Sequence, residues 1–125
     1  MVAMLSLGFM SSMQAQHMNA PNAPCQNVGS NADETGCFIA ASETANKTLN
    51  RLYAEINRIL STADRDKLIA AERLWIRYRD ANCDAERGLY GGGSGGPTAY
   101  AACIAANTET RVAELKTIYG WRLEK

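Results

Sequence analysis

The sequence contains a single histidine, His17, and no charged residue before Asp33. It also lacks an excess of either charge, because 13 basic residues balance 13 acidic ones. Nucleic acids and anionic membrane surfaces select partners with a basic excess, so this balance argues against both as the main partner. With 125 residues, the chain has room for one domain with a modest core.

The sequence has no apolar run of the about 20 residues that a membrane-spanning helix needs. The apolar stretch over residues 2–10 is instead typical of the central region of a secretory signal peptide, with cleavage expected after Ala15. No basic residue precedes it and Met13 is large for its position, which a misplaced or truncated start would explain. The alternative is an N-terminus that is flexible or docks on the core. We expect residues 1–15 to be a signal peptide, and the mature domain to be periplasmic or secreted without an integral membrane segment.

An even number of cysteines supports export. Four cysteines in a short chain with a leader are typical of two disulfides, although they allow three pairings. They are Cys25, Cys37, Cys83 and Cys103. Zinc ligands usually come as close pairs, whereas the spacings here are 12, 46 and 20 positions and the only histidine lies in the leader region. We therefore expect neither a metal site nor a cofactor.

The first part of the mature chain is predicted to be irregular and then helical. Residues 16–31 are rich in Asn, Pro, Ala and Gly, and we expect this irregular arm to extend to residue 36. A helix is expected after Cys37, because apolar residues recur at steps of three and four and so share one face. These residues are Phe38, Ala41, Ala45, Leu49, Leu52, Tyr53, Ile56, Ile59 and Leu60.

Two further helices are predicted. Ser61 and Thr62 can accept amide protons at the start of a helix that reaches about Leu89. Its predicted inner stripe is Leu68, Ala71, Trp75, Tyr78 and Asn82. Residues 90–97 hold five glycines and are predicted to form a loop. Thr98 is predicted to cap the third helix, and Gly120 to end it. The predicted inner face of that helix is Ile104, Thr108, Val112, Leu115, Ile118 and Tyr119.

The predicted fold is all-α, with three antiparallel helices over residues 37–120 after a short irregular arm. Cys83 lies seven residues before Tyr90, and Cys103 lies five after Thr98. At a rise of about 1.5 Å per residue, the two cysteines sit at similar heights on either side of the loop. This predicts a Cys83–Cys103 disulfide that locks the hairpin, and it leaves Cys25–Cys37 to tie the arm to the first helix.

The glycine loop also matches a catalytic pattern. Residues 92–96 read G-x-S-x-G around Ser94, as at the nucleophile of some hydrolases. That turn needs a preceding strand and a His partner, whereas a helix is predicted before this loop and the only histidine lies in the leader region. Asp80 and Asp84 are one turn apart, but the neighbouring arginines make them part of an ordinary charged face. We expect that the protein is not an enzyme.

An aromatic and polar cluster occupies one face of the second predicted helix. Its members are Trp75, Tyr78, Arg79 and Asn82. Arg111 falls in the middle of the inner face of the third helix, where an unpaired charge would be costly. Its partner is expected among Glu72, Asp80 and Glu86. We predict a structural clamp formed by Trp75, Tyr78, Asp80 and Arg111, the alternative being a polar binding surface.

The same region resembles a family signature. Residues 71–83 (AERLWIRYRDANC) are similar to the signature of the bacterial LprI-like family. Residues 49–53 (LNRLY), the loop at residues 90–94 and residues 103–115 resemble further segments of that family in the same order. The resemblance covers about residues 25–119. One departure is Glu72, where the family commonly has Gln.

The resemblance implies an exported bacterial protein of a family in which some members inhibit lysozyme, so the implied partner is lysozyme. A rigid protrusion would have to enter a cleft lined by carboxylates. The expected contacts are Tyr90, Gly92, Gly93, Ser94 and Gly95 in the loop, with Arg77 and Arg79 as a second surface. The alternative is an envelope protein that binds another protein or a cell-wall component without inhibiting lysozyme. The sequence does not indicate an oligomeric state.

Overall fold

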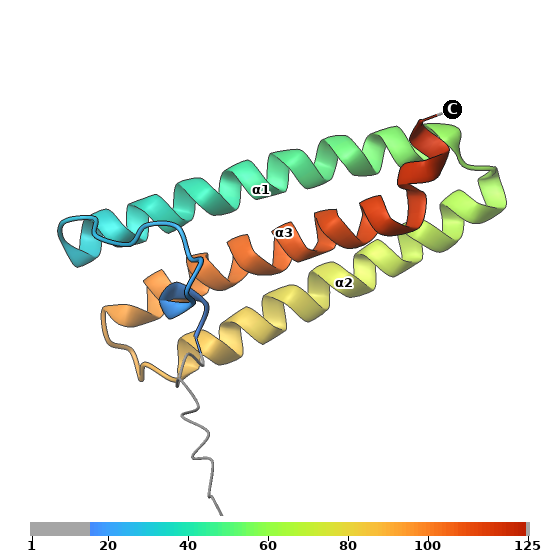
Figure 1. Ribbon diagram of the computed structural model, residues 1–125. Helices are drawn as coiled ribbons and strands as arrows, with labels where there is room; N and C mark the ends of the chain where they lie inside the picture. Colours follow the sequence, from blue (N-terminus) through green and yellow to red (C-terminus); the bar gives the residue numbers. More distant parts are fainter. Residues whose placement is uncertain (1–15, 125) are drawn as a thin grey trace, which may run out of the picture.

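The computed structural model describes residues 16–124 and has an all-α architecture (Figure 1). A 3₁₀ turn, η1 (His17–Asn19), precedes three long helices, α1 (Asn31–Ile59), α2 (Thr62–Gly88) and α3 (Gly95–Leu123). Consecutive helices run antiparallel, and residues 16–124 contain no strand. Disulfides join Cys25 to Cys37 and Cys83 to Cys103. The predicted fold class and both predicted disulfides are confirmed.

None of the helices in the described part of the chain is long and apolar enough to cross a membrane. The predicted signal peptide, residues 1–15, lies outside the described residues.

Helix α1 begins at Asn31, six residues before the predicted helix start at residue 37. The Ser30 hydroxyl accepts from the Asp33 amide at 3.2 Å, and the Asp33 carboxylate accepts from the Ser30 amide at 3.1 Å. This reciprocal pair satisfies two donors that a helix start otherwise leaves unpaired. The two hydrogen bonds from Ser30 hold the pKa of the Asp33 carboxyl below its usual value, with the backbone bond as the larger cause. The arm therefore ends at Ser30.

The predicted bounds of the third helix are also wrong at both ends. Helix α3 begins at Gly95, so Thr98 is not its cap but a buried residue within the first turns. There the Thr98 hydroxyl hydrogen-bonds to the hydroxyl of Thr35 on α1 at 2.5 Å. At the other end, the helix continues through Gly120 to Leu123. Gly120 does not adopt the left-handed conformation that ends helices, so it does not act as a stop.

Helix α3 lies between the other two helices (Figure 1). It packs along both α1 and α2, whereas the backbones of α1 and α2 hardly approach each other. The first half of α3 is buried on nearly all sides, and its alanines allow the neighbouring elements to come close. The arm crosses this end, where η1 packs against α3. The core therefore runs along α3 rather than between three equivalent helices.

The main apolar cluster fills the end of the domain near the α1–α2 connection. It consists of Leu49, Leu52, Ile56, Leu60, Leu68, Val112 and Leu115. The Ser61 hydroxyl accepts from the Asp64 amide and caps α2 at this end, as predicted. Ile118, predicted to face inward, is about half exposed.

The inner stripe of α2 differs from the predicted one by about one position. The residues with little exposure are Leu68, Glu72, Arg79 and Cys83, whereas the predicted Ala71, Tyr78 and Asn82 are exposed. Glu72 and Arg79 thus lie at inner positions, although the apolar pattern of the sequence places them on the surface. They can do so because each is paired inside the domain.

Candidate functional site

A buried ion pair joins α2 to α3. Arg111 donates from Nε and one terminal nitrogen to Glu72 Oε2 at 3.2 and 3.0 Å. The side chains of Arg111 and Glu72 are only 9% and 7% exposed. The other terminal nitrogen of Arg111 pairs with Glu114, which is half exposed. Arg111 therefore faces inward, and its partner across the hairpin is Glu72 rather than Asp80.

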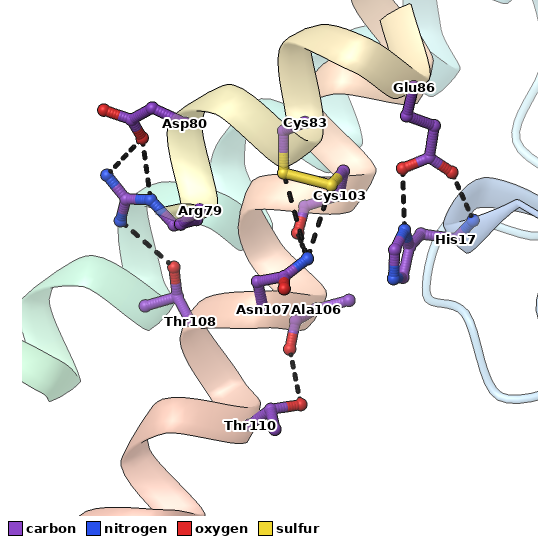
Figure 2. Close-up of a disulfide and its surroundings, with 10 residues drawn as sticks. All are labelled: His17, Arg79, Asp80, Cys83, Glu86, Cys103, Ala106, Asn107, Thr108 and Thr110. Atoms are coloured by element: carbon purple, nitrogen blue, oxygen red, sulfur yellow. Dashed lines mark hydrogen bonds and ion pairs between the residues drawn. A yellow bond between two sulfur atoms is a disulfide. The ribbon is translucent and has the colours of Figure 1, made fainter. Parts of the chain in front are cut away.

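Arg79 connects all three helices, and Figure 2 shows its contacts with Asp80 and Thr108. Its guanidinium pairs with Asp80 at 2.9 Å and donates to Asn46 of α1 at 3.0 Å and to Thr108 of α3 at 3.3 Å. The Arg79 side chain is only 14% exposed, so it does not form the predicted contact surface with Arg77. Two residues apart on a helix differ by about 200° in direction, and Arg77 accordingly remains exposed.

Trp75 lies between the two buried arginines. The guanidinium of Arg79 is 5.1 Å from the centroid of its ring, and that of Arg111 is 5.8 Å away. Both distances are within the range of cation–π attraction. Tyr78, which we assigned to the same clamp, is 64% exposed and does not belong to it. The residues gathered at the centre of the domain are thus Trp75 with the two arginines and their acceptors.

The Cys83–Cys103 disulfide is fully buried, and the side chain of Asn107 lies against it (Figure 2). Asn107 donates to the Cys103 carbonyl at 2.9 Å and lies 3.3 Å from the Cys103 sulfur. On the other side, Glu86 accepts from the His17 amide at 3.0 Å and contacts His17 Nδ1 at 2.7 Å. His17 is therefore part of the folded domain, where it holds the arm on α2.

His17, Glu86 and Cys103 bring atoms of metal-ligand type within 4.8 Å of one another. The Cys103 sulfur, however, is bonded to Cys83, and only a thiolate acts as a metal ligand. These residues do not fit a metal ion.

The loop between α2 and α3 is shorter than predicted, because α3 starts at Gly95. Gly91 and Gly92 have φ angles of +56° and +84°, which favour glycine. A Cβ at Gly95 would lie 2.6 Å from the Tyr90 ring, so glycine is required there for the ring to pack on the helix start. Residues 91–94 of the loop are exposed, as is Leu89 directly after α2.

Tyr90 turns toward the arm rather than toward solvent. Its hydroxyl donates to Gln16 Oε1 and lies 4.0 Å from the sulfur of Met18. Burial raises the pKa of the Tyr90 phenol, and the negative charges of Glu86 and Glu34 raise it further. Tyr90 therefore stays neutral as a donor to the arm, and of the predicted loop contacts, Gly92, Gly93 and Ser94 remain accessible.

An exposed apolar stripe on the outer face of α2 leads to this loop. It consists of Leu74, Tyr78, Ala81, Ala85 and Leu89. Their spacing of three and four residues places them on one helix face, over about 22 Å at 1.5 Å per residue. Arg77 is exposed at the edge of the stripe. We missed this stripe in the sequence because Tyr78 was assigned to the inner face, although the spacing from Leu74 to Leu89 is visible there.

Known proteins that are similar to this chain indicate its family. The chain is 28% identical to the uncharacterized protein R02472 of Rhizobium meliloti (strain 1021) over 111 residues, which cover 78% of this chain and 80% of the relative. No solved structure matches the chain significantly. The family model described as lysozyme inhibitor LprI matches residues 23–115, which include both disulfides, the buried ion pair and the loop. The chain belongs to the LprI lysozyme inhibitor family.

Proposed function

We propose that this protein is an exported, non-catalytic inhibitor that binds lysozyme and blocks its cleft. The observation that carries the proposal is the match to the lysozyme inhibitor LprI family over residues 23–115. Two disulfides in a domain of this size support export, because such bridges persist in oxidising compartments. The helix before Ser94 supports a non-catalytic role, since a hydrolase nucleophile of this pattern follows a strand.

The contact surface that we propose is the apolar stripe of α2 together with Arg77 and residues 91–94. Aromatic residues and arginines are enriched where protein interfaces bind most strongly. Tyr78 is a large side chain that is 64% exposed and makes no contribution to the core. Lysozyme cleaves with a pair of carboxyl groups in its cleft, and the Arg77 guanidinium is complementary to them.

The loop contributes a rigid tip to this surface. The Cys83–Cys103 disulfide and the packing of Tyr90 on Gly95 fix both ends of the loop before a partner arrives. A preorganised loop loses little conformational entropy on binding. Gly92 presents its backbone without a side chain, so its amide can approach an acceptor closely, whereas the Gly93 amide already donates to the Tyr90 carbonyl at 2.9 Å.

The direct test is inhibition of chicken-type and goose-type lysozymes by the purified, disulfide-bonded chain. We expect at least one class to be inhibited, and Tyr78→Ala and Arg77→Ala each to weaken inhibition about tenfold or more, as interface anchors do. Ile118→Ala and Arg51→Ala are matched controls, because both residues are exposed and lie on α3 and α1, whereas the stripe lies on α2. If neither lysozyme class is inhibited at micromolar excess, the proposal is wrong. A partner unrelated to lysozyme, recovered from periplasmic extract, would then favour an envelope adaptor.

A further inference from the structure

A groove of about 550 Å³ separates α1 from α2. It exists because both helices pack on α3 while their backbones hardly approach each other. The volume lies within the range of about 300–1,000 Å³ that small-molecule sites occupy. Asn46, Asn50 and Tyr53 line it from α1, and Glu72, Arg73 and Ile76 line it from α2.

One buried oxygen of this groove has no partner in the described part of the chain. Glu72 Oε2 accepts both hydrogen bonds from Arg111, whereas Glu72 Oε1 accepts none. The Glu72 side chain is 7% exposed. A buried carboxylate oxygen without a donor is unfavourable, and such groups are rare in folded proteins. A ligand in the groove that carries an O–H or N–H group can satisfy it.

The charges around the groove restrict that ligand. Arg73 and Arg79 line it together with Glu72, so a cation would meet two guanidinium groups. A simple anion would meet the unpaired oxygen of Glu72. The charges of Glu72 and Arg79 are already balanced by Arg111 and Asp80. Among the described residues, Arg73 is the lining charge without an ion pair, so these charges disfavour a cation and suit a ligand whose oxygens accept from Arg73 and whose donors reach Glu72.

The remaining lining residues fit a sugar. Asn50 and Tyr53 offer an amide and a phenol, and Asn46 keeps its amide nitrogen as a donor while its oxygen accepts from Arg79. Ile69 and Ile76 add aliphatic surface that can cover the C–H face of a ring. We propose that this groove binds one or two neutral sugar residues, with a sugar hydroxyl donating to Glu72 Oε1 and the Arg73 guanidinium donating to a sugar oxygen.

This site is separate from the proposed lysozyme surface. The groove lies between α1 and α2, whereas the stripe from Leu74 to Leu89 follows the outer face of α2. Arg73 lines the groove, whereas Arg77, one turn further along, lines a neighbouring pocket with Arg73 and Ile76 but not the groove itself. Arg77→Ala is therefore a near control for the groove, and failure of one proposal leaves the other testable.

The test is an amide-resolved NMR titration of the full chain with both disulfides formed. The probes are N,N′-diacetylchitobiose and cellobiose as neutral sugars, and glycylglycine as a zwitterion. We expect at least one sugar to bind with a dissociation constant of about 1 mM or lower and to shift the amides around Asn46 and Asn50. Asn50→Ala and Arg73→Ala should each weaken binding about tenfold, whereas Arg77→Ala should leave it unchanged.

Glu72→Gln tests the unpaired oxygen itself. Glutamine keeps the size of the side chain and can still accept from Arg111, but its second terminal atom becomes a donor. We expect sugar binding to fall about tenfold or more, with folding checked by circular dichroism. The proposal is overturned if neither sugar binds at about 50 mM, if glycylglycine alone binds, or if Arg77→Ala weakens binding as much as Arg73→Ala. Because Asn50 is exposed, Asn50→Ala decides the question even where Glu72→Gln does not fold.

Discussion

Removal of one member of the Glu72–Arg111 pair should destabilise the domain strongly. Arg111→Leu leaves Glu72, which is 5% exposed as a residue, without a donor for either carboxylate oxygen. Breaking a buried pair in this way typically costs about 3–5 kcal/mol, and we expect about 4 kcal/mol here. Glu72→Met should cost about 3 kcal/mol, because Arg111 retains Glu114. Either loss is a large share of the free energy of unfolding of a typical domain, which is about 5–15 kcal/mol.

The double variant Glu72→Met/Arg111→Leu distinguishes the desolvation argument from a simple count of contacts. Both new side chains are apolar and would extend the cluster that includes Leu68, Val112 and Leu115. Replacing both ions by apolar groups of similar volume is often neutral or stabilising. We expect the double variant to lie within about 1 kcal/mol of the original chain, although the two single losses sum to about 7 kcal/mol.

The assay is urea unfolding of the oxidised chain followed by far-ultraviolet circular dichroism, with the slope checked for two-state behaviour. Glu114→Ala is the control, because Glu114 is half exposed and its pair with Arg111 should contribute less than about 1 kcal/mol. The reasoning is refuted if the double variant loses as much as the sum of the single variants. It is also refuted if Arg111→Leu costs less than about 1 kcal/mol.

Three other predictions concern the local features of the fold. Replacing both Cys83 and Cys103 by Ser should lower the free energy of unfolding by about 3 kcal/mol, as expected for a bridge that closes a loop of 20 residues; an unchanged urea midpoint would contradict this. Ser61→Ala should lower the free energy of unfolding by about 1 kcal/mol in the same assay, because it removes the cap of α2. A loss below about 0.3 kcal/mol would contradict the capping role. The pKa of the Asp33 carboxyl is lowered in the folded state by its hydrogen bonds from Ser30. Its contribution to stability is therefore complete above the unfolded-state pKa of 3.8, and it is lost as the pH falls through the lower folded-state pKa. Unfolding measured over a pH series should therefore show a weaker acid dependence for Asp33→Asn, and identical curves would count against the linkage.

Helical periodicity predicted the presence and order of the three helices, and the rise per residue predicted the Cys83–Cys103 pair, which left Cys25–Cys37 as the other disulfide. The apolar residues of α1, such as Leu49, Leu52 and Ile56, are buried because their spacing matches the helix repeat. The heights of Cys83 and Cys103 follow from the rise per residue alone, which is why their pairing could be predicted. These features depend on local geometry, and local geometry can be calculated from sequence positions.

The inner face of α2 could not be predicted in the same way. An apolar pattern favours Ala71 and Tyr78, whereas the structure buries Glu72 and Arg79. Their burial depends on partners in other helices, including Arg111, and no periodicity within α2 shows those partners. The start of α1 at Asn31, in contrast, could have been predicted, because the Ser-x-x-Asp pattern of its capping box is visible in the sequence.

The position of the arm also depends on distant partners. His17 binds Glu86, and Gln16 accepts from the Tyr90 hydroxyl, over separations of 69 and 74 residues. The loop residue Tyr90 was expected to face a binding partner, but the arm occupies its hydroxyl. Contacts of this kind fix which loop residues remain accessible, and they become visible only in three dimensions.

The central place of α3 has a consequence for the order in which the domain can form. Synthesis proceeds from the N-terminus, so α1 and α2 are complete before the helix that covers their apolar faces exists. A nascent chain that ends before Gly95 holds two amphipathic helices with hardly any backbone contact between them, and it lacks Cys103, the second cysteine of the hairpin bridge. Cooperative folding therefore has to wait for the last quarter of the sequence. Deleting α3 would leave an unfolded chain rather than a two-helix remnant.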